Sequence, residues 1–204
     1  PTANGCGYVR GPGNSAWATE HDAATGSATV QNSPAVVASH YGTDNNNIYR
    51  TFAPYDTSAL TASATITGGA NKIAVYLTAK TDTNSVTLGM VANTQASNTN
   101  LVNADYDQLG TTLGGSVTLA SMTVSATTDL TFNATGDSWI SKTSYTPVGF
   151  RLSPDYLNVE PAGDNTCEPV VSGANASVLT VTYTLPATAS VVIKQMIGGG
   201  FIEF

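Results

Sequence analysis

The residues best suited to acid–base chemistry near neutral pH are two histidines, His21 and His40. His21 lies between Glu20 and Asp22 in the stretch WATEHDAAT, so a neighbouring carboxylate is available to orient its ring. A nucleophilic triad also needs a serine or cysteine that converges on the histidine. The sequence contains neither a nucleophile elbow nor an HExxH motif. We therefore expect no catalytic residue here, and interpret the segment around His21 as an exposed polar loop.

Pairs of carboxylates are a second arrangement with chemical potential, because glycoside hydrolysis uses two acids placed across a cleft. Asp155 and Glu160 flank the stretch YLNV, and Asp105 and Asp107 flank Tyr106. Sequence spacing does not show whether either pair faces a cleft. Acids in the loops of an acidic protein are usually solvated. We therefore predict a protein that is not an enzyme.

Two acidic segments are candidates for a structural calcium ion, which prefers oxygen ligands from carboxylates, asparagine side chains and backbone carbonyls. The first is TDNNN around Asp44, and the second is EPAGDN around Glu160 and Asp164. Neither has the spacing of an EF-hand, and an ordinary Asx turn explains either segment equally well. Apart from such a calcium ion, we expect no cofactor.

Aromatic side chains suggest a different function, because flat rings can stack on sugars. Trp17, Tyr41, Tyr106 and Tyr156 are the candidates for a sugar-stacking platform, which would bind surface glycans. Trp139 lies on a predicted short helix and is expected to cover the edge of the core. Aromatic residues make up only 8% of the chain and do not cluster in one loop.

The sequence contains two cysteines, Cys6 and Cys167. No nearby group of cysteines and histidines has the spacing of a zinc site. The pair can form one disulfide between the early and late parts of the chain, or remain as two buried thiols. The sequence leaves both readings open.

Composition limits the partners of this chain. Its 204 residues and 20.9 kDa suit a single domain. Charged residues make up 10% of it, against about 25% in typical soluble domains, which favours an extracellular or particle-surface β protein. The net charge of −7 repels phosphates and anionic membranes, so we predict no nucleic-acid partner and no membrane partner. Pro1 fits removal of either a leader or an initiator methionine.

Hydrophobic alternation predicts many short strands separated by Gly, Asn and Pro. In residues 48–56, Ile48, Arg50 and Phe52 share one side of a strand, and Pro54 is expected to restrict its end to a sheet edge. Residues 178–185 alternate most regularly and end at Pro186. A short helix is predicted within 135–143.

Three segments taken in order resemble a known family: NIYRTFAPYDTSALTASATITGGANKIAVYL, LTFNATGDSWISKTSYTPVGFRLSPDY and SVLTVTYTLP. They resemble DNRLRE-type jelly-roll domains, which are related to carbohydrate-binding modules, in the variant common in phage and environmental sequences. The resemblance covers about residues 8–186. It departs at Tyr55, where phenylalanine is usual, and at Pro54. Arg50 and Arg151 are similar to the structural arginines of this family, so we expect them to pair with carboxylates or carbonyls.

The strand spacing favours a β-sandwich, and the resemblance implies the same all-β fold, a single antiparallel β-sandwich or jelly roll. We expect it to carry one short helix and a C-terminal extension that lies outside the shared pattern. We accordingly expect an irregular lead-in over residues 1–15, the sandwich over 16–186, and an apolar C-terminal assembly arm over 187–204. The apolar side chains of the expected arm are Val191, Val192, Ile193, Met196, Ile197, Phe201, Ile202 and Phe204.

An apolar arm beyond a complete domain is typical of assembly, because such side chains form an adhesive patch when left in water. We therefore predict a non-enzymatic structural protein on a virion surface, as a capsid decoration or tail-associated subunit. In this prediction the arm docks on a neighbouring subunit of a homo-oligomer or larger particle. The alternatives are an extracellular filament subunit joined by strand addition, or a carbohydrate-binding module.

Overall fold

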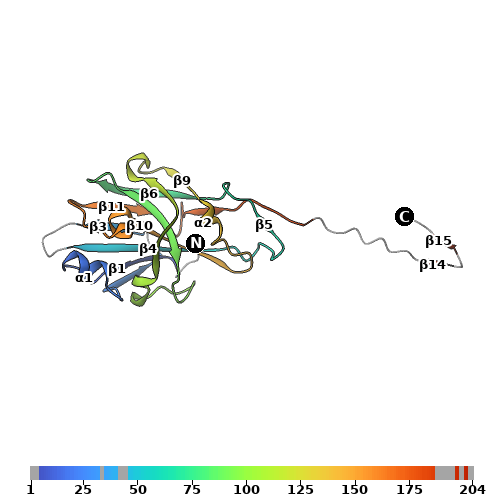
Figure 1. Cartoon of the computed structure of the whole chain (residues 1–204), viewed down its shortest axis with the longest axis horizontal. Coiled ribbons are helices and arrows are strands. Elements are labelled where there is room, and N and C mark those ends of the chain that lie inside the picture. Colours follow the sequence, from blue (N-terminus) through green and yellow to red (C-terminus); the bar gives the residue numbers. More distant parts are fainter. Residues whose placement is uncertain (1–4, 33–34, 41–45, 187–195, 198–199, 202–204) are drawn as a thin grey trace.

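Antiparallel strands are the main regular structure of the described residues (Figure 1). The computed structural model describes residues 5–32, 35–40, 46–186, 196–197 and 200–201. The strands are β1 Gly7–Arg10, β2 Ala28–Gln31, β3 Val37–His40, β4 Asn47–Asp56, β5 Thr65–Ile66, β6 Lys72–Asp82, β7 Thr87–Asn93, β8 Leu109–Thr118, β9 Thr127–Thr131, β10 Tyr145–Leu152, β11 Asn165–Pro169, β12 Val178–Thr180, β13 Tyr183–Thr184, β14 Met196–Ile197 and β15 Gly200–Phe201. The short helices are α1 Trp17–His21, α2 Ala134–Asp137 and α3 Ser153–Leu157, with 3-10 segments η1 Asn103–Gln108 and η2 Leu119–Ser121.

One large sheet, curled on itself, makes up the sandwich. Its strand order is β12-β6-β11-β3-β4-β10-β7-β8, with β1 joining β2 to β4 and β9 pairing with β6. Each of these strand pairs is antiparallel. The predicted all-β antiparallel sandwich is confirmed. The sequence analysis predicted one short helix, and the structure adds α1 and α3 to it.

Strand β4 separates two hydrophobic clusters by its alternation. Ala53 and Tyr55 face the larger cluster, which fills the sandwich, whereas Ile48 and Phe52 face a smaller cluster on the opposite side. The smaller cluster also contains Trp17 of α1 together with Tyr106 of η1 and Leu109 of β8. Arg50 lies between Ile48 and Phe52 in the sequence and therefore points to this second side.

Pro54 does not end β4 at an edge, contrary to the sequence prediction. The strand continues to Asp56 and pairs with β10 over this stretch, where Pro54 lies opposite Pro147. Neither residue has a backbone N–H to donate, so the ladder places two non-donors against each other. A proline is tolerated inside this sheet at a position where the residue opposite it also lacks an N–H donor.

Three other local predictions differ from the structure. Residues 7–10, expected to be irregular, form β1 between β2 and β4. The expected strand over 178–185 is divided, because β12 pairs with β6 and β13 pairs with β5. The predicted helix within 135–143 is the shorter α2, and its N-cap is Asn133 rather than Thr135 or Asp137. The Asn133 side chain accepts a hydrogen bond from Gly136 N at 2.9 Å.

The expected arm falls mostly outside the described residues, including Val191, Val192, Ile193, Ile202 and Phe204. The backbones of Met196 and Ile197 form β14, which pairs with β15. Among the described helices, none combines the length and apolar character that crossing a bilayer requires.

Candidate functional site

Helix α3 and the loop behind it form the candidate site. Pro154 stands in the first turn of the helix, where its missing N–H costs nothing. The helix ends at Asn158, which has a left-handed backbone with φ 52° and ψ 50°. This tight ending separates Asp155, which points inward, from Leu157 and Val159, which are exposed. The element therefore has a charged inner side and an apolar outer side.

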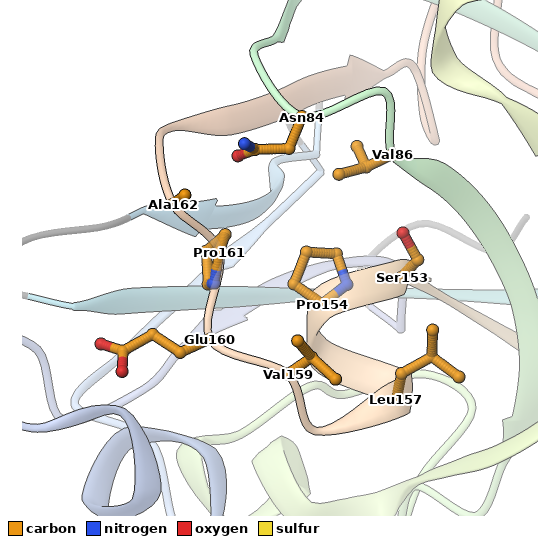
Figure 2. A pocket seen from close by; sticks show the side chains of 9 residues that line it. All are labelled: Asn84, Val86, Ser153, Pro154, Leu157, Val159, Glu160, Pro161 and Ala162. Atoms are coloured by element: carbon orange, nitrogen blue, oxygen red, sulfur yellow. The ribbon is translucent and has the colours of Figure 1, made fainter.

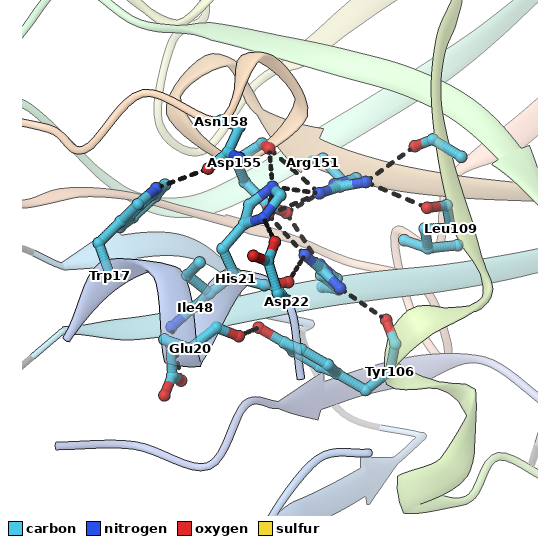
Figure 3. A network of polar contacts seen from close by, with 12 residues as sticks. Trp17, Glu20, His21, Asp22, Ile48, Tyr106, Leu109, Arg151, Asp155 and Asn158 are labelled. Carbon is cyan, nitrogen blue, oxygen red and sulfur yellow. Dashed lines mark hydrogen bonds and ion pairs between the residues drawn. The ribbon is translucent and has the colours of Figure 1, made fainter. Parts of the chain in front are cut away.

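The inner side is a buried ion cluster centred on Asp155 (Figure 3). Arg50 of β4 donates from Nε to Asp155 Oδ2 at 3.0 Å and from Nη2 to Oδ1 at 2.8 Å. Arg151 of β10 donates to the same two oxygens, in each case at 2.7 Å. One carboxylate thus receives two bidentate arginines, an arrangement with fixed geometry and strong, charge-assisted bonds. We call Arg50, Arg151 and Asp155 the α3 charge network.

The excess positive charge of the network is compensated by carbonyls and an aromatic ring. Arg50 donates to the carbonyls of Tyr106 and His21 at 3.0 and 2.9 Å, and its guanidinium lies 4.1 Å from the centroid of the Tyr106 ring. Arg151 donates to the carbonyls of Leu109 and Gly110 at 3.0 and 3.1 Å. The prediction that Arg50 and Arg151 pair with carboxylates or carbonyls is confirmed.

The electrostatics of the network favour its charged state. Burial raises the pKa of Asp155, but the charges of Arg50 and Arg151 outweigh burial, so its pKa lies well below the usual range. Burial also lowers the pKa of Arg50, and the Asp155 charge outweighs it in turn, leaving that pKa raised. Burial raises the pKa of the Tyr106 phenol. Asp155 therefore stays ionised and cannot supply a proton near neutral pH.

His21 joins the edge of the network rather than an exposed loop, contrary to the sequence interpretation. Its Nδ1 lies 2.5 Å from Asp22 Oδ1, and its Nε2 lies 2.9 Å from the carbonyl oxygen of Asp155. Trp17 stacks beside its ring and donates from Nε1 to Asn158 Oδ1 at 3.0 Å. Within the described part of the chain, no serine or cysteine hydrogen-bonds to His21. The histidine therefore links α1 to α3.

Glu20 is a buried acid that the sequence analysis did not single out. Its Oε2 accepts hydrogen bonds from Gly13 N at 2.6 Å and Ser15 Oγ at 3.1 Å, and its Oε1 accepts from Ile48 N at 3.1 Å. Tyr106 donates its hydroxyl to the Glu20 carbonyl at 2.8 Å. The acidic side chain thus satisfies backbone donors of the N-terminal loop. A buried role of this kind leaves no simple sequence signal.

The outer side of α3 is an apolar groove of about 300 Å³ (Figure 2). We call it the α3 groove. Leu157 and Val159 lie side by side at one margin and are 63% and 60% exposed. Glu160 turns its carboxylate away from the groove, where Oε1 accepts a hydrogen bond from Asn46 Nδ2 at 3.0 Å. The lining residues are Asn84, Val86, Ser153, Pro154, Leu157, Val159, Glu160, Pro161 and Ala162.

Those sugar-stacking candidates that the structure describes do not form a platform. Trp17 and Tyr106 are buried in the smaller hydrophobic cluster, so neither ring offers a free face to a sugar. Tyr156 is half-buried and packs against Gly89 of β7, where a Cβ atom would lie 2.8 Å from its ring. Tyr41 lies outside the described residues. Trp139 packs against the larger cluster, in agreement with its predicted role.

The described acidic candidates for a calcium site or a carboxylate pair do not share one site. Asp155 is buried in the network, whereas Glu160 and Asp164 are exposed and Asp44 lies outside the described residues. In the part of the chain that is described, no three His, Cys, Asp or Glu side chains come together as a metal site would require.

Cys6 and Cys167 are free thiols buried in the larger cluster, as in the second of the two readings.

The second carboxylate pair has no cleft between its members. Asp105 is buried, and its two oxygens accept hydrogen bonds from Ala96 N at 3.0 Å and Val102 N at 2.9 Å. Asp107 is exposed. Asp105 therefore fixes the loop that carries η1.

Comparison of the chain with protein-family models, with curated proteins and with solved structures finds no match. The relation to DNRLRE-type domains accordingly remains a sequence resemblance. The assignment of a function rests on the two sides of α3.

Proposed function

We propose that this chain is a non-enzymatic structural subunit that assembles through apolar contacts with neighbouring protein copies. The observation that carries the proposal is the α3 groove, in which Leu157 and Val159 stand exposed on an element anchored by buried ions. Exposed apolar side chains grouped on a rigid base are a feature of interaction surfaces.

The polar groups of the site support a structural role instead of a catalytic one. Both oxygens of Asp155 are occupied by arginines, and Glu20 is bonded to the backbone. A general acid or base needs a free proton position within reach of a substrate. Neither of these buried acids offers one.

Exposed apolar residues also gather along the last strands of the sandwich. Val178 and Leu185 are 58% and 57% exposed, and Tyr183 is 42% exposed. Segment 187–204 follows directly and adds eight apolar side chains. Complete burial of each such side chain contributes about 1.5–3 kcal/mol. Burial of these side chains against a neighbouring copy therefore provides a strong driving force for assembly.

A virion surface is the setting we propose for this assembly, with an extracellular location as the wider class. The support is compositional, because charged residues make up 10% of the chain and the sequence resembles phage-associated jelly rolls. The net charge of −7 and the internal bonding of Arg50 and Arg151 disfavour nucleic-acid and membrane partners.

An extracellular filament joined by strand addition is the second candidate. Strand β12 stands at the end of the main sheet path, and its Val178 is exposed. An incoming extended segment could pair with such an edge. The third candidate, a carbohydrate-binding module, loses support because Trp17 and Tyr106 are buried.

Mass measurement by light scattering over a range of concentrations tests the proposal. The full chain should form oligomers, and the full-length double variant I193D/I197D should remain monomeric. The matched control S190D/Q195D adds the same charge but keeps every apolar side chain, and should assemble like the parent. A parent chain that is monomeric at every concentration refutes the assembly function, and a double variant that assembles like the parent shows that Ile193 and Ile197 do not contribute to it.

A further inference from the structure

We propose that the α3 groove receives residues 191–197 of a second copy of this chain, so that copies join head to tail. This inference rests on the proposed assembly function and specifies the surface, the occupant and the orientation. The occupant has the sequence VVIKQMI, which is rich in β-branched aliphatic residues. A groove of about 300 Å³ is at the lower end of the range for binding pockets, and suits a few aliphatic side chains better than a folded domain.

The groove is formed by elements that are held in place without the occupant. Asp155 ties α3 to β4 and β10 through Arg50 and Arg151. The opposite wall starts at the β6–β7 turn, where Val86 is buried and its N–H donates to Asp82 Oδ1 at 2.8 Å. A preformed groove lowers the ordering cost of binding, because only the incoming segment loses conformational freedom.

The groove and Pro186, the last described residue before the segment, lie toward opposite ends of the sandwich. Residues leading to Pro186 form β13, which pairs with β5 at one end (Figure 1), and the groove begins just after β6 at the other. The length of strand β6 gives this separation. Its first residue, Lys72, pairs with Thr180 of β12, and its last residue, Asp82, pairs with Asn165 of β11. Ten residue steps of about 3.3 Å place these ends about 33 Å apart. The groove begins at Asn84, just beyond Asp82.

This separation excludes the groove of the same copy for the first apolar residues of the segment. Ile193 is seven residues beyond Pro186, so it reaches at most about 25 Å from it even when fully extended. Pro186 itself lies beyond β12, on the side away from the groove. Val191, Val192 and Ile193 can therefore enter the α3 groove only on another copy.

Symmetry agrees with this orientation. Because donor segment and receiving groove are different surfaces, the contact is heterologous. Such contacts repeat, and they close into a ring or extend as an open chain.

Mixing two defective full-length copies tests the inference. L157D carries a blocked groove with an intact segment, and I193D/I197D carries an intact groove with a blocked segment. Each alone should lose association by about tenfold or more, as expected for a central contact. The mixture should form one-to-one pairs, because one intact groove meets one intact segment. V124D, at an exposed valine elsewhere, is the control and should assemble like the parent.

The outcomes separate this inference from the proposed function. If I193D/I197D prevents assembly but L157D and V159D assemble like the parent, the groove is not the receptor while the assembly function stands. If I193D/I197D assembles like the parent, the segment is not the occupant and the inference fails, whereas a parent chain that stays monomeric at every concentration refutes the assembly function itself. Should both groove variants lose their fold, a peptide of residues 187–197 is added to I193D/I197D and hydrogen exchange is followed. Protection of residues 153–162 supports the inference, and unchanged exchange there overturns it.

Discussion

The two sides of helix α3 invert the usual distribution of polar and apolar groups. On the inner side, a carboxylate and two guanidinium groups are buried and bonded to one another. On the outer side, Leu157 and Val159 face solvent. A helix of five residues is too short to be stable alone, so the buried ions hold it in place. The comparison shows that the buried charges hold α3 in place. Its exposed apolar side chains remain available for contact with a partner.

The largest predicted effect comes from breaking the inner side. D155N leaves Arg50 and Arg151 buried without their carboxylate, which should lower the free energy of unfolding by about 3–5 kcal/mol. Urea unfolding followed by circular dichroism measures it. The control is D129N, which removes the exposed Lys72–Asp129 pair at 2.7 Å and should cost less than about 1 kcal/mol. Equal losses in the two variants would contradict a special role for the network.

Acid should remove the stabilisation that the α3 charge network gives to the fold. The pKa of Asp155 is lower in the folded protein than in the unfolded chain, so the unfolded chain takes up the proton first as the pH falls. The stabilisation is therefore complete above about pH 4, the ordinary range of an aspartate, and is lost as the pH drops towards the folded pKa. Unfolding free energies measured from pH 6 to about pH 2 should fall more steeply for the parent than for D155N. Parallel curves would exclude this contribution.

A smaller effect is expected at the junction between α1 and α3. W17F removes the indole donor of the bond to Asn158 and should cost about 1 kcal/mol. N158G removes the acceptor but tolerates the left-handed backbone. A double-mutant cycle on unfolding free energies isolates the bond. Additive effects would show that the two helices are not coupled through it.

The smallest effect on stability should come from the outer side. L157A removes an exposed side chain and should change the unfolding free energy by less than about 0.5 kcal/mol. Its matched control is L152A, which truncates a fully buried leucine only five residues away and should cost about 2–5 kcal/mol. A large loss in L157A would place Leu157 in the core instead of on a contact surface.

The sequence predicted the parts of the fold that depend on local patterns. Alternation in residues 48–56 placed Arg50 on the same side as Ile48 and Phe52, and a buried arginine needs a partner. The sequence could not identify that partner, because Asp155 is 105 residues away and only the topology brings them together. The same limit applies to Trp17 and Tyr106, whose burial depends on α1 and η1 covering the second side of β4.

The division of residues 178–185 shows a second limit. Their alternation is regular, but the neighbouring strand changes from β6 to β5 within it, and strand partners leave no local signal. The sequence analysis did not predict the α3 groove, because exposure also depends on the fold. Leu157 and Val159 resemble core residues by type, and only their position at the end of α3 exposes them.

The central claim is that residues 191–197 of one copy occupy the α3 groove of another. A photo-cross-linking amino acid in place of Val159, in mixed isotopically light and heavy full-length chains, tests it most directly. Mass spectrometry should find position 159 joined to residues 187–197 in peptides that combine one light and one heavy partner. Cross-links confined to chains of a single isotope, or directed elsewhere, would contradict the claim.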